Sequence, residues 1–442
     1  MLYKKTKIGV SKIKKNIIKP SILPGFMELL PKEQKIFNDI VSKITKVYED
    51  NGCLAIDTPI IEKAEVLLAK TGGETEKQVY SFEKGKNKLA LRFDLTVPFA
   101  RYVAQYCNDI TFPFKRYQIG KVYRGERNQK GRYREFYQCD IDVIGKDKLS
   151  INNDGWVISL ASKAFKSIGL SNYRFQISNR KILKGILNEL AIENINQVMI
   201  LIDKYDKVGK DVFINELENA IGFEKTIYLN KVLEINGSSK EIRDKLLKLN
   251  INNKDFVDGV EELNEVCNIL SILGVEEKEY EINLKIIRGL DYYTGTVFET
   301  ILVGNEGYGS ICSGGRYDNL AENYTNNILP GVGISIGITR LFFVLKEIGF
   351  IDNYNINKNL DYLILPIGNT LKYCGEVMKS LEAKGYSVSI YFEEDSLKKK
   401  MTYANKLGVK NVILIGEEEV RENKVKIKNM ISGSESIINY KR

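Results

Sequence analysis

The pattern of apolar and polar residues divides the chain up to residue 275 into three kinds of segment. Residues 31–50 predict an amphipathic helix, which Gly52 is expected to end, because apolar side chains recur at helical spacing. Those side chains are Ile36, Phe37, Ile40, Ile44 and Val47. A short strand is expected from there to Thr58. Residues 112–144 predict two strands around a polar turn that contains glycine. From about 178 to 275 the pattern becomes helical and rich in lysine and asparagine.

Strand patterns return after residue 275 and decide the expected topology. They run from Ile282 to Leu302 and again over 331–337. We therefore predict one antiparallel-sheet domain that is interrupted by a helical insertion. The last part of the chain alternates apolar strands with helices, which is typical of a small parallel or mixed sheet. These strands are expected at 362–367, 387–392 and 411–415, with helices at about 370–384 and 396–407.

These segments give an α+β fold class with a second, α/β domain at the C-terminus. We expect a basic N-terminal extension over residues 1–20 and a main domain over 21–345. The helical insertion lies within the main domain at about 178–275. An asparagine-rich linker over 346–360 precedes the C-terminal domain at 361–442.

The composition of this 442-residue chain narrows its chemistry. It contains no histidine, which excludes imidazole bases, Ser-His and Cys-His nucleophiles and histidine metal sites. Its six cysteines form no CxxC pair, a spacing that suits reduced thiols in the cytoplasm. No stretch approaches the roughly 20 apolar residues that span a bilayer, so we expect no membrane association.

The first twenty residues carry seven lysines and no acidic residue. Three interpretations stay open: a solvated tail, a basic arm that contacts nucleic acid, and an organelle transit peptide. The absence of arginine from this segment weakens the third interpretation. The net charge of +9 permits a polyanionic partner without requiring one.

Arginine is scarce and unevenly placed. Only 15 of the 66 basic residues are arginine, and seven of these lie between Arg92 and Arg134. Three others are Arg288, Arg316 and Arg340. The planar guanidinium group can hold a phosphate or carboxylate through two hydrogen bonds. We therefore expect anion sites at these arginines.

The predicted hairpin at 112–144 carries an unusual set of polar residues. Side chains alternate along a strand, so one face of its second strand is apolar and the other is polar. The apolar face holds Tyr137, Cys139, Ile141 and Val143. The polar face holds Arg134, Phe136, Gln138, Asp140 and Asp142, with Arg124 and Glu126 beside the turn. A solvated face with paired charges is one interpretation. Burying this set is costly unless it binds something, and the open aromatic ring favours a binding site.

The sequence YRGE…GRYREF in this hairpin resembles motif 2 of class II aminoacyl-tRNA synthetases. The helix at 31–50 with Gly52 and Pro59 resembles motif 1, which forms the dimer interface in that family. GVGISIGITRL resembles motif 3, although Thr339 stands where many members carry an acid. The resemblance implies an antiparallel-sheet catalytic domain that binds ATP. It also implies that the C-terminal module is an anticodon-binding domain.

The ATP-binding residues that this resemblance implies come from motifs 2 and 3. Arg124 would hold the α-phosphate, Glu126 would read the adenine and Phe136 would stack beneath it. Arg132 also belongs to this set. Arg340, in the first turn of a helix, would contact the γ-phosphate, in keeping with the affinity of helix starts for anions.

Two further segments resemble the signatures of histidyl-tRNA synthetases: IIRGLDYYTGTVFET at 286–300 and SGGRYDNL at 313–320. The match implies that Arg288 contacts the substrate carboxylate and the α-phosphate. Positions that hold the α-ammonium group are matched by Asp94, Thr96 and Gln138. Positions that line the imidazole pocket are matched by Asp142, Tyr293 and Tyr317, with Tyr292 beside them. A carboxylate and a tyrosine hydroxyl supply the acceptor and donor that an imidazole needs.

The implied reaction is attachment of L-histidine to histidine tRNA, with ATP as a substrate and Mg²⁺ as cofactor, by a cytoplasmic homodimer. An alternative is a non-catalytic regulatory subunit of ATP phosphoribosyltransferase, a paralogue of these enzymes that usually lacks the anticodon-binding domain. A class II synthetase for another amino acid and a tRNA-binding scaffold with an inactive site are further alternatives. The inactive scaffold is disfavoured because the expected active-site residues are all present: Arg124, Glu126, Arg288 and Arg340. These residues decide the matter, since fold alone does not decide function.

Overall fold

The computed structural model describes residues 18–69, 74–127, 129–287, 292–354 and 360–440. The chain divides into two units, Met1–Tyr354 and Asn355–Arg442. No helix among the described residues is both long and apolar enough to cross a membrane.

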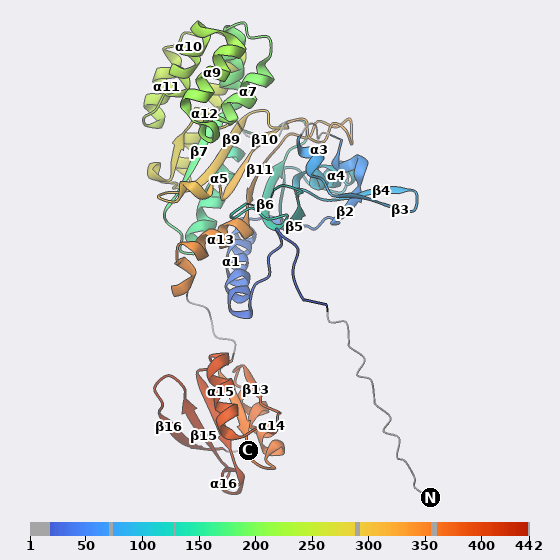
Figure 1. Cartoon of the computed structure of the whole chain (residues 1–442), viewed down its shortest axis with the longest axis vertical. Helices are drawn as coiled ribbons and strands as arrows, with labels where there is room; N and C mark the ends of the chain where they lie inside the picture. The colour runs from blue at the N-terminus through green and yellow to red at the C-terminus, as the bar shows by residue number, and fades with distance from the viewer. Residues whose placement is uncertain (1–17, 70–73, 128, 288–291, 355–359, 441–442) are drawn as a thin grey trace, which may run out of the picture. The chain divides into compact units, whose positions relative to one another are not determined.

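The first unit is built on an eight-stranded sheet with the order β1-β5-β6-β11-β10-β9-β7-β8 (Figure 1). The strands are β1 (Leu54–Ala55), β5 (Phe114–Tyr123), β6 (Glu135–Ile144), β7 (Tyr173–Asn179), β8 (Tyr280–Ile282), β9 (Thr296–Leu302), β10 (Cys312–Tyr317) and β11 (Gly331–Ile336). All neighbours from β5 to β7 are antiparallel. Each of the two edge strands is parallel to its neighbour: β1 to β5, and β8 to β7. The predicted hairpin at 112–144 is confirmed as β5 and β6. The expected strand before Thr58 is shortened to Leu54–Ala55.

Three helices cover the apolar face of β6: α1 (Pro31–Asp50), α5 (Asn152–Ser167) and α13 (Ile338–Glu347). Cys139, Ile141 and Val143 are fully buried on this face, as the alternation predicts. The Phe37 ring of α1 lies 5.5 Å from the rings of both Tyr137 and Phe342, and so joins the helix to the sheet and to α13. The predicted helix at 31–50 is confirmed. Its buried side ends with Tyr48, while Val47 is only partly buried.

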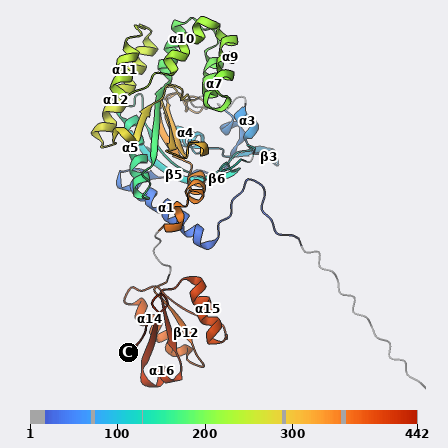
Figure 2. The ribbon, with the colours of Figure 1, turned by 60° about the vertical axis from the view of Figure 1, so that its left-hand side comes forward.

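Helices fill the chain between β7 and β8. They are α6 (Arg180–Glu189), α7 (Ile195–Asp203), α8 (Tyr205–Val208), α9 (Lys210–Ile221), α10 (Phe223–Leu233), α11 (Ser239–Leu247) and α12 (Lys254–Ile272), followed by the short η1 (Glu277–Glu279). Figures 1 and 2 show them gathered at one end of this unit, beyond β7. Glycines let α6 and α12 approach closely, because a Cβ on Gly185 would lie 2.5 Å from the backbone nitrogen of Phe256.

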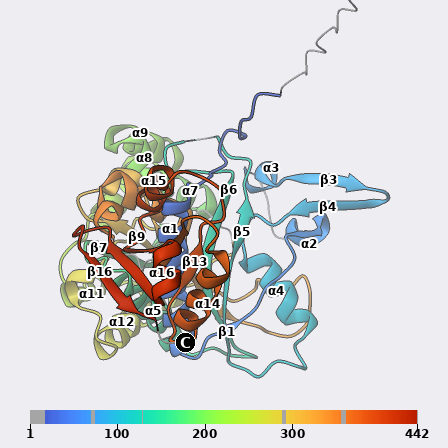
Figure 3. The same cartoon turned by 90° about the horizontal axis from the view of Figure 1, so that it is seen from below.

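A small three-stranded sheet lies beside the large one, in the order β2-β4-β3. Its strands are β2 (Ile61–Lys63), β3 (Ser81–Lys84) and β4 (Asn87–Leu91), accompanied by α2 (Ala64–Leu67), α3 (Glu74–Gln78) and α4 (Thr96–Gln105). The β3–β4 hairpin projects from the body of the unit (Figure 3). Short 3-10 helices, η2 (Glu306–Tyr308) and η3 (Phe350–Asn353), complete the unit. The expected strand from Ile282 to Leu302 is interrupted, since β8 ends at Ile282 and β9 begins at Thr296.

The second unit holds a five-stranded sheet in the order β13-β12-β14-β15-β16. Its elements are β12 (Tyr362–Pro366), α14 (Leu371–Glu382), β13 (Val388–Ile390), α15 (Leu397–Leu407), β14 (Asn411–Ile415), α16 (Glu417–Glu422), β15 (Lys424–Asn429) and β16 (Glu435–Asn439). The three predicted strands are confirmed as the parallel part of this sheet. The β15–β16 hairpin adds an antiparallel edge that the apolar pattern did not predict.

Candidate active site

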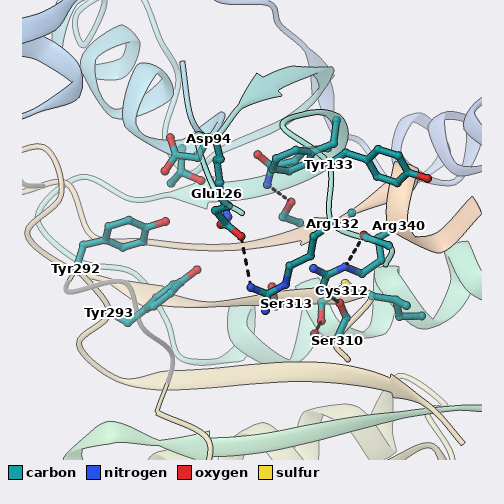
Figure 4. A pocket seen from close by; sticks show the side chains of 18 residues that line it. Asp94, Glu126, Arg132, Tyr133, Tyr292, Tyr293, Ser310, Cys312, Ser313 and Arg340 are labelled. Atoms are coloured by element: carbon teal, nitrogen blue, oxygen red, sulfur yellow. Dashed lines mark hydrogen bonds and ion pairs between the residues drawn. The ribbon is translucent and has the colours of Figure 1, made fainter. Parts of the chain in front are cut away.

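A pocket of about 240 Å³ opens on the polar face of β6. Strands β6, β10 and β11, the loop after β5 and the first turns of α4 and α13 all contribute to its lining. Figure 4 shows that Asp94, Tyr292 and Tyr293 lie toward one end of the pocket, while Arg132 and Arg340 lie toward the other. The polar face of β6 therefore forms the floor of a cavity rather than a solvated surface.

Three arginines give one end of the pocket a positive potential. Arg340 donates from Nη1 to the Ser310 carbonyl at 2.8 Å and from Nε to the Gly131 carbonyl at 3.2 Å. Burial, together with the charges of Arg132 and Arg124, lowers the pKa of Arg340 to about 10. Burial is the main cause of this shift, and the neighbouring guanidinium groups add to it, so an anion bound at this end would favour the charged form of Arg340.

Glu126 is the carboxylate of this positive end. It pairs with the Arg132 guanidinium at 3.4 Å across the turn between β5 and β6. Phe136 is half-buried and presents its ring to the pocket, with the Arg124 guanidinium carbon 5.2 Å from the ring centroid. The Arg124 Nε donates to the Phe93 carbonyl at 2.9 Å, which fixes this side chain. An aromatic face beside fixed cations suits a planar base joined to phosphates.

The other end of the pocket is acidic. Asp94 is 2% exposed, and its Oδ1 accepts a hydrogen bond from the Val97 N–H at 3.0 Å, while its Oδ2 has no partner. Burial raises the pKa of Asp94 to about 6. Gln138 donates from Nε2 to the Ser335 hydroxyl at 2.6 Å, and its carbonyl oxygen is also without a partner. Unpartnered acceptors of this kind are suited to an ammonium group.

A narrow extension of about 20 Å³ continues from the acidic end into the sheet. Thr96, Tyr293, Ser313 and Ser335 line both the main pocket and this extension. At its end, Asp142 pairs with Arg116 at 2.5 Å and accepts a hydrogen bond from the Tyr317 hydroxyl at 2.6 Å.

Glycine on β11 makes room for this arrangement. A Cβ on Gly333 would lie 2.0 Å from Asp142 Oδ1, and a Cβ on Gly331 would lie 2.4 Å from the Tyr317 ring. Tyr292 and Tyr293 close the side of the acidic end, with their ring centroids 4.8 Å apart. The Tyr292 ring also meets the Tyr317 ring edge-on at 6.2 Å. Tyr292 and Tyr293 lie outside any strand, so they are not an ordinary pair of strand residues.

The structure brings the described candidate residues into one cavity. Asp142 and Tyr317 line the extension, and the remaining described candidates line the main pocket. Those remaining residues are Asp94, Thr96, Arg124, Glu126, Arg132, Phe136, Gln138, Tyr292, Tyr293 and Arg340. Arg288 lies outside the described residues. The pattern missed Ser310, Ser313 and Ser335, whose single hydroxyl groups leave no sequence signal. Asp140, which the alternation placed on the polar face but to which the resemblance gave no role, lines the extension.

The expectation of an anion site at each of these arginines is wrong for four of them. Arg116 pairs with Asp142, Arg101 with Glu62 and Arg316 with Asp154, all within the protein. Arg92 donates to the carbonyl oxygens of Thr58 and Lys121. Among the described residues, Arg92, Arg116 and Arg316 are buried and serve internal carbonyls and carboxylates rather than the cavity.

Thr339 lies away from the main pocket. Its hydroxyl accepts a hydrogen bond from the Tyr137 N–H at 2.8 Å and thereby ties α13 to β6. The side chain does not line the main pocket, so its departure from the motif 3 pattern leaves the pocket lining unchanged.

The antiparallel sheet, the motif order and the charged pocket have the architecture of a class II aminoacyl-tRNA synthetase catalytic domain. The family model for histidyl-tRNA synthetase matches residues 25–341, and the model for the anticodon-binding domain matches residues 361–441. The chain belongs to the histidyl-tRNA synthetase family, as the motifs predicted.

Similar proteins cover nearly the whole chain. A histidine–tRNA ligase from Clostridium acetobutylicum is 65% identical over 424 residues, which are 96% of this chain and 99% of that protein. A histidine–tRNA ligase from Clostridium tetani is 49% identical over 425 residues, covering 96% and 97%. The crystal structure of histidyl-tRNA synthetase from Nostoc sp. PCC 7120 matches with a TM-score of 0.85 and 36% identity, covering 96% of this chain and 97% of that one.

Proposed function

We propose that this protein is a histidine–tRNA ligase, which activates L-histidine with ATP and transfers the histidyl group to the 3′ end of histidine tRNA. The observation that carries the proposal is the division of charge in one pocket, with arginines at one end and buried carboxylates at the other. The α-ammonium group of an amino acid is complementary to the carboxylates, and the phosphates of a nucleoside triphosphate are complementary to the arginines. Membership of the family supplies the reaction that joins the two substrates.

In the first step a histidine carboxylate oxygen attacks the α-phosphorus of ATP. A new O–P bond forms, the bond to the β-phosphate oxygen breaks, and pyrophosphate leaves. The nucleophile is already ionised, so the step needs no general base and depends on positioning and charge stabilisation. This requirement agrees with a pocket that is rich in arginine and with a chain that contains no histidine.

We assign the nucleotide to the positive end of the pocket. Arg124 would contact the α-phosphate, and Phe136 would stack on the adenine, which Glu126 would read. Arg132 and Arg340 would hold the outer phosphates. Arg288 would act with Arg124 on the reacting carboxylate and phosphate, an assignment that rests on the resemblance of its segment to the family. Mg²⁺ would enter with the ATP phosphates, because this ion usually binds through substrate phosphates and one or two carboxylates rather than a dedicated protein cage.

We assign histidine to the acidic end. Asp94, Thr96 and Gln138 would hold the α-ammonium group, and the unpartnered oxygens of Asp94 and Gln138 support this role. The imidazole would enter the extension toward Asp142 and Tyr317, between the walls formed by Tyr292 and Tyr293.

The remaining proposals concern the whole molecule. The C-terminal unit would bind the anticodon, since its sequence matches that domain, and tRNA binding should weaken as salt rises. We propose a cytoplasmic homodimer; the exposed apolar side chains of Leu23 and Leu30, in the segment that precedes α1, support a subunit contact there. The domain boundaries are proposed at residues 21–345 and 361–442, with the insertion at about 178–275 and the linker at 346–360.

The test is amino-acid-dependent ATP–pyrophosphate exchange with the purified protein and each of the twenty amino acids. We expect exchange with histidine alone, and its loss in Arg124→Ala. Exchange with another amino acid would retain the class of enzyme and refute the pocket assignment. A folded protein that binds histidine without exchange would instead support the regulatory-subunit alternative. The anticodon-domain match and the high identity to proteins named histidine–tRNA ligase favour the enzyme.

A further inference from the structure

Asp140 is a buried carboxylate of the pocket to which the proposed reaction gives no role. It lies between Gln138 and Asp142 on the polar face of β6 and lines the narrow extension. Only 1% of its surface is exposed, and its Oδ1 has no hydrogen-bond partner. A buried carboxylate oxygen without a partner is costly in a folded protein. Its presence here requires an explanation.

Of the side chains near Asp140 in the sheet, the Ser335 hydroxyl, directly opposite on β11, hydrogen-bonds to its carboxyl group, but no donor reaches Oδ1. Gln118, directly opposite on β5, donates from Nε2 to Asp57 at 2.9 Å and to the Thr58 hydroxyl at 3.0 Å. Gln138 donates to Ser335. Arg116 directs Nη2 to Asp142. The Nε and Nη1 of Arg116 have no partner, yet neither is directed to Asp140. The arrangement therefore leaves Oδ1 of Asp140 available to a ligand.

Charge balance leads to the same conclusion. Arg116 and the Tyr317 hydroxyl satisfy Asp142, whereas no ion pair joins Asp140 to any described cation. Burial raises the pKa of Asp140 to about 7, and the negative charges of Asp142 and Asp94 add to this effect, while Arg116 and Ser335 oppose it. Asp140 can therefore carry or release a proton near neutral pH, in the same range as an imidazole.

We infer that Asp140 is a substrate-binding residue whose Oδ1 forms a hydrogen bond with one ring nitrogen of histidine, opposite the Asp142–Tyr317 pair. This inference rests on the proposed function. Asp140 lines the extension but not the main pocket, so it meets the side chain of the amino acid rather than its ammonium group. One proton is shared between Asp140 and the ring. Either the protonated carboxyl donates to the ring nitrogen, or the carboxylate accepts from the imidazolium N–H, and both forms have the same net charge.

This contact has a consequence for substrate selection. A ring nitrogen bonded to Asp140 cannot carry a methyl group, because the carboxyl oxygen would occupy the place of that methyl, and the narrow extension offers it no other space. The protein should therefore reject the histidine that is methylated on the nitrogen facing Asp140. Removing the carboxylate should weaken histidine binding and at the same time relax this rejection.

The test is pyrophosphate exchange by the full-length protein with histidine and with its two ring N-methyl isomers. For Asp140→Ala we expect the KM for histidine to rise about 10- to 150-fold, the range reported for hydrogen bonds to charged groups. The KM for ATP should change less than threefold. The preference for histidine over the rejected isomer, measured as a ratio of kcat/KM, should fall at least tenfold. Asp154→Asn is the matched control, because Asp154 is equally buried but pairs with Arg316; it should lower the melting temperature and leave that ratio unchanged.

Two outcomes would overturn the inference: a KM for histidine within threefold of wild type, or equal rises in the KM for histidine and for ATP with an unchanged ratio. If Asp140→Ala does not fold, Asp140→Asn, which keeps the volume, is judged by the same ratio. Absence of histidine-dependent exchange in the wild type would refute the proposed function alone. Calorimetric titration with histidine and its methyl isomers would then still decide whether Asp140 contacts the ring.

Discussion

Substitution of Asp94 measures how much a buried charge at the acidic end of the pocket destabilises the unliganded protein. The pKa of Asp94 lies at about 6 in the folded protein, compared with an ordinary value of 3.8. Each pKa unit corresponds to about 1.4 kcal/mol, so the ionised side chain destabilises the unliganded fold by about 3 kcal/mol. The folded state binds the proton more tightly than the unfolded chain. Stability from this group is therefore lost as pH rises from about 4 to about 7.

Asp94→Asn removes the charge and keeps an oxygen for the Val97 N–H. At pH 8 we expect the unliganded variant to be more stable than wild type by about 1–3 kcal/mol, or roughly 2–5 °C in Tm for a unit of this size. At pH 4 the gain should vanish, because Asp94 is then protonated in wild type. The KM for histidine should rise about 10- to 150-fold through loss of a charged partner.

The assay is thermal unfolding of wild type and variant without ligand, from pH 4 to pH 8.5, together with exchange kinetics at pH 8. A variant that is destabilised equally at all pH values would refute the reasoning, because Asp94 would then be a structural residue. A stabilised variant with an unchanged KM for histidine would refute its contact with the ammonium group. The expected combination of greater stability and weaker binding is the usual mark of a binding residue whose charge the fold leaves uncompensated.

Three further predictions test other parts of the pocket and its support. Arg340→Gln should lower the kcat of exchange about 10²- to 10³-fold with little change in the KM for histidine, because it removes a positive charge from the nucleotide end. A large rise in the KM for histidine would contradict the placement of Arg340 at that end. Phe136→Leu should raise the KM for ATP roughly tenfold by removing the aromatic face, as measured in exchange at varied ATP. Arg316→Met leaves Asp154 buried and unpaired, and should destabilise the protein by about 3–5 kcal/mol in urea unfolding. Adding Asp154→Leu should recover most of that loss, and no recovery would show that the pair has another role.

The sequence pattern was sufficient to predict much of the site because the site lies on a strand. Alternation along 136–142 separates the residues that pack against helices from those that face the pocket, and the structure follows this separation. Arg134, which the pattern placed on the polar face, lines neither the pocket nor its extension and donates to the Glu126 carbonyl instead. The alternation also placed Asp140 on the pocket side. The polar residues on this face are costly to bury without a ligand. Their occurrence on a strand that is expected to be buried therefore indicates a binding site from the sequence alone.

The fate of individual arginines could not be predicted in the same way. Arg92 and Arg316 are buried beside groups from other parts of the chain, and Asp154 lies 162 residues from Arg316. Arg116 pairs with Asp142, which lies directly opposite it in the β5–β6 hairpin. Residue type gives the capacity to bind an anion, but only the fold decides whether that anion belongs to the protein or to a ligand. The β15–β16 hairpin was missed for a related reason. In β15 the apolar residues alternate with lysines, two of which pair with Glu435 of β16, so this strand gives no apolar run.

The pKa shifts at the two ends of the pocket have opposite directions, and a bound ligand of the opposite charge would offset each of them. The pKa of Arg340 is lowered at the nucleotide end, while the pKa values of Asp94 and Asp140 are raised at the amino-acid end. Each shift favours the neutral form, so each end carries charge that the fold does not balance. ATP would balance the first end and histidine the second. Each ligand should therefore stabilise the protein separately, by an amount set by its own concentration and affinity. The energy released on binding both is then available to bring the carboxylate and the α-phosphate together between the two ends.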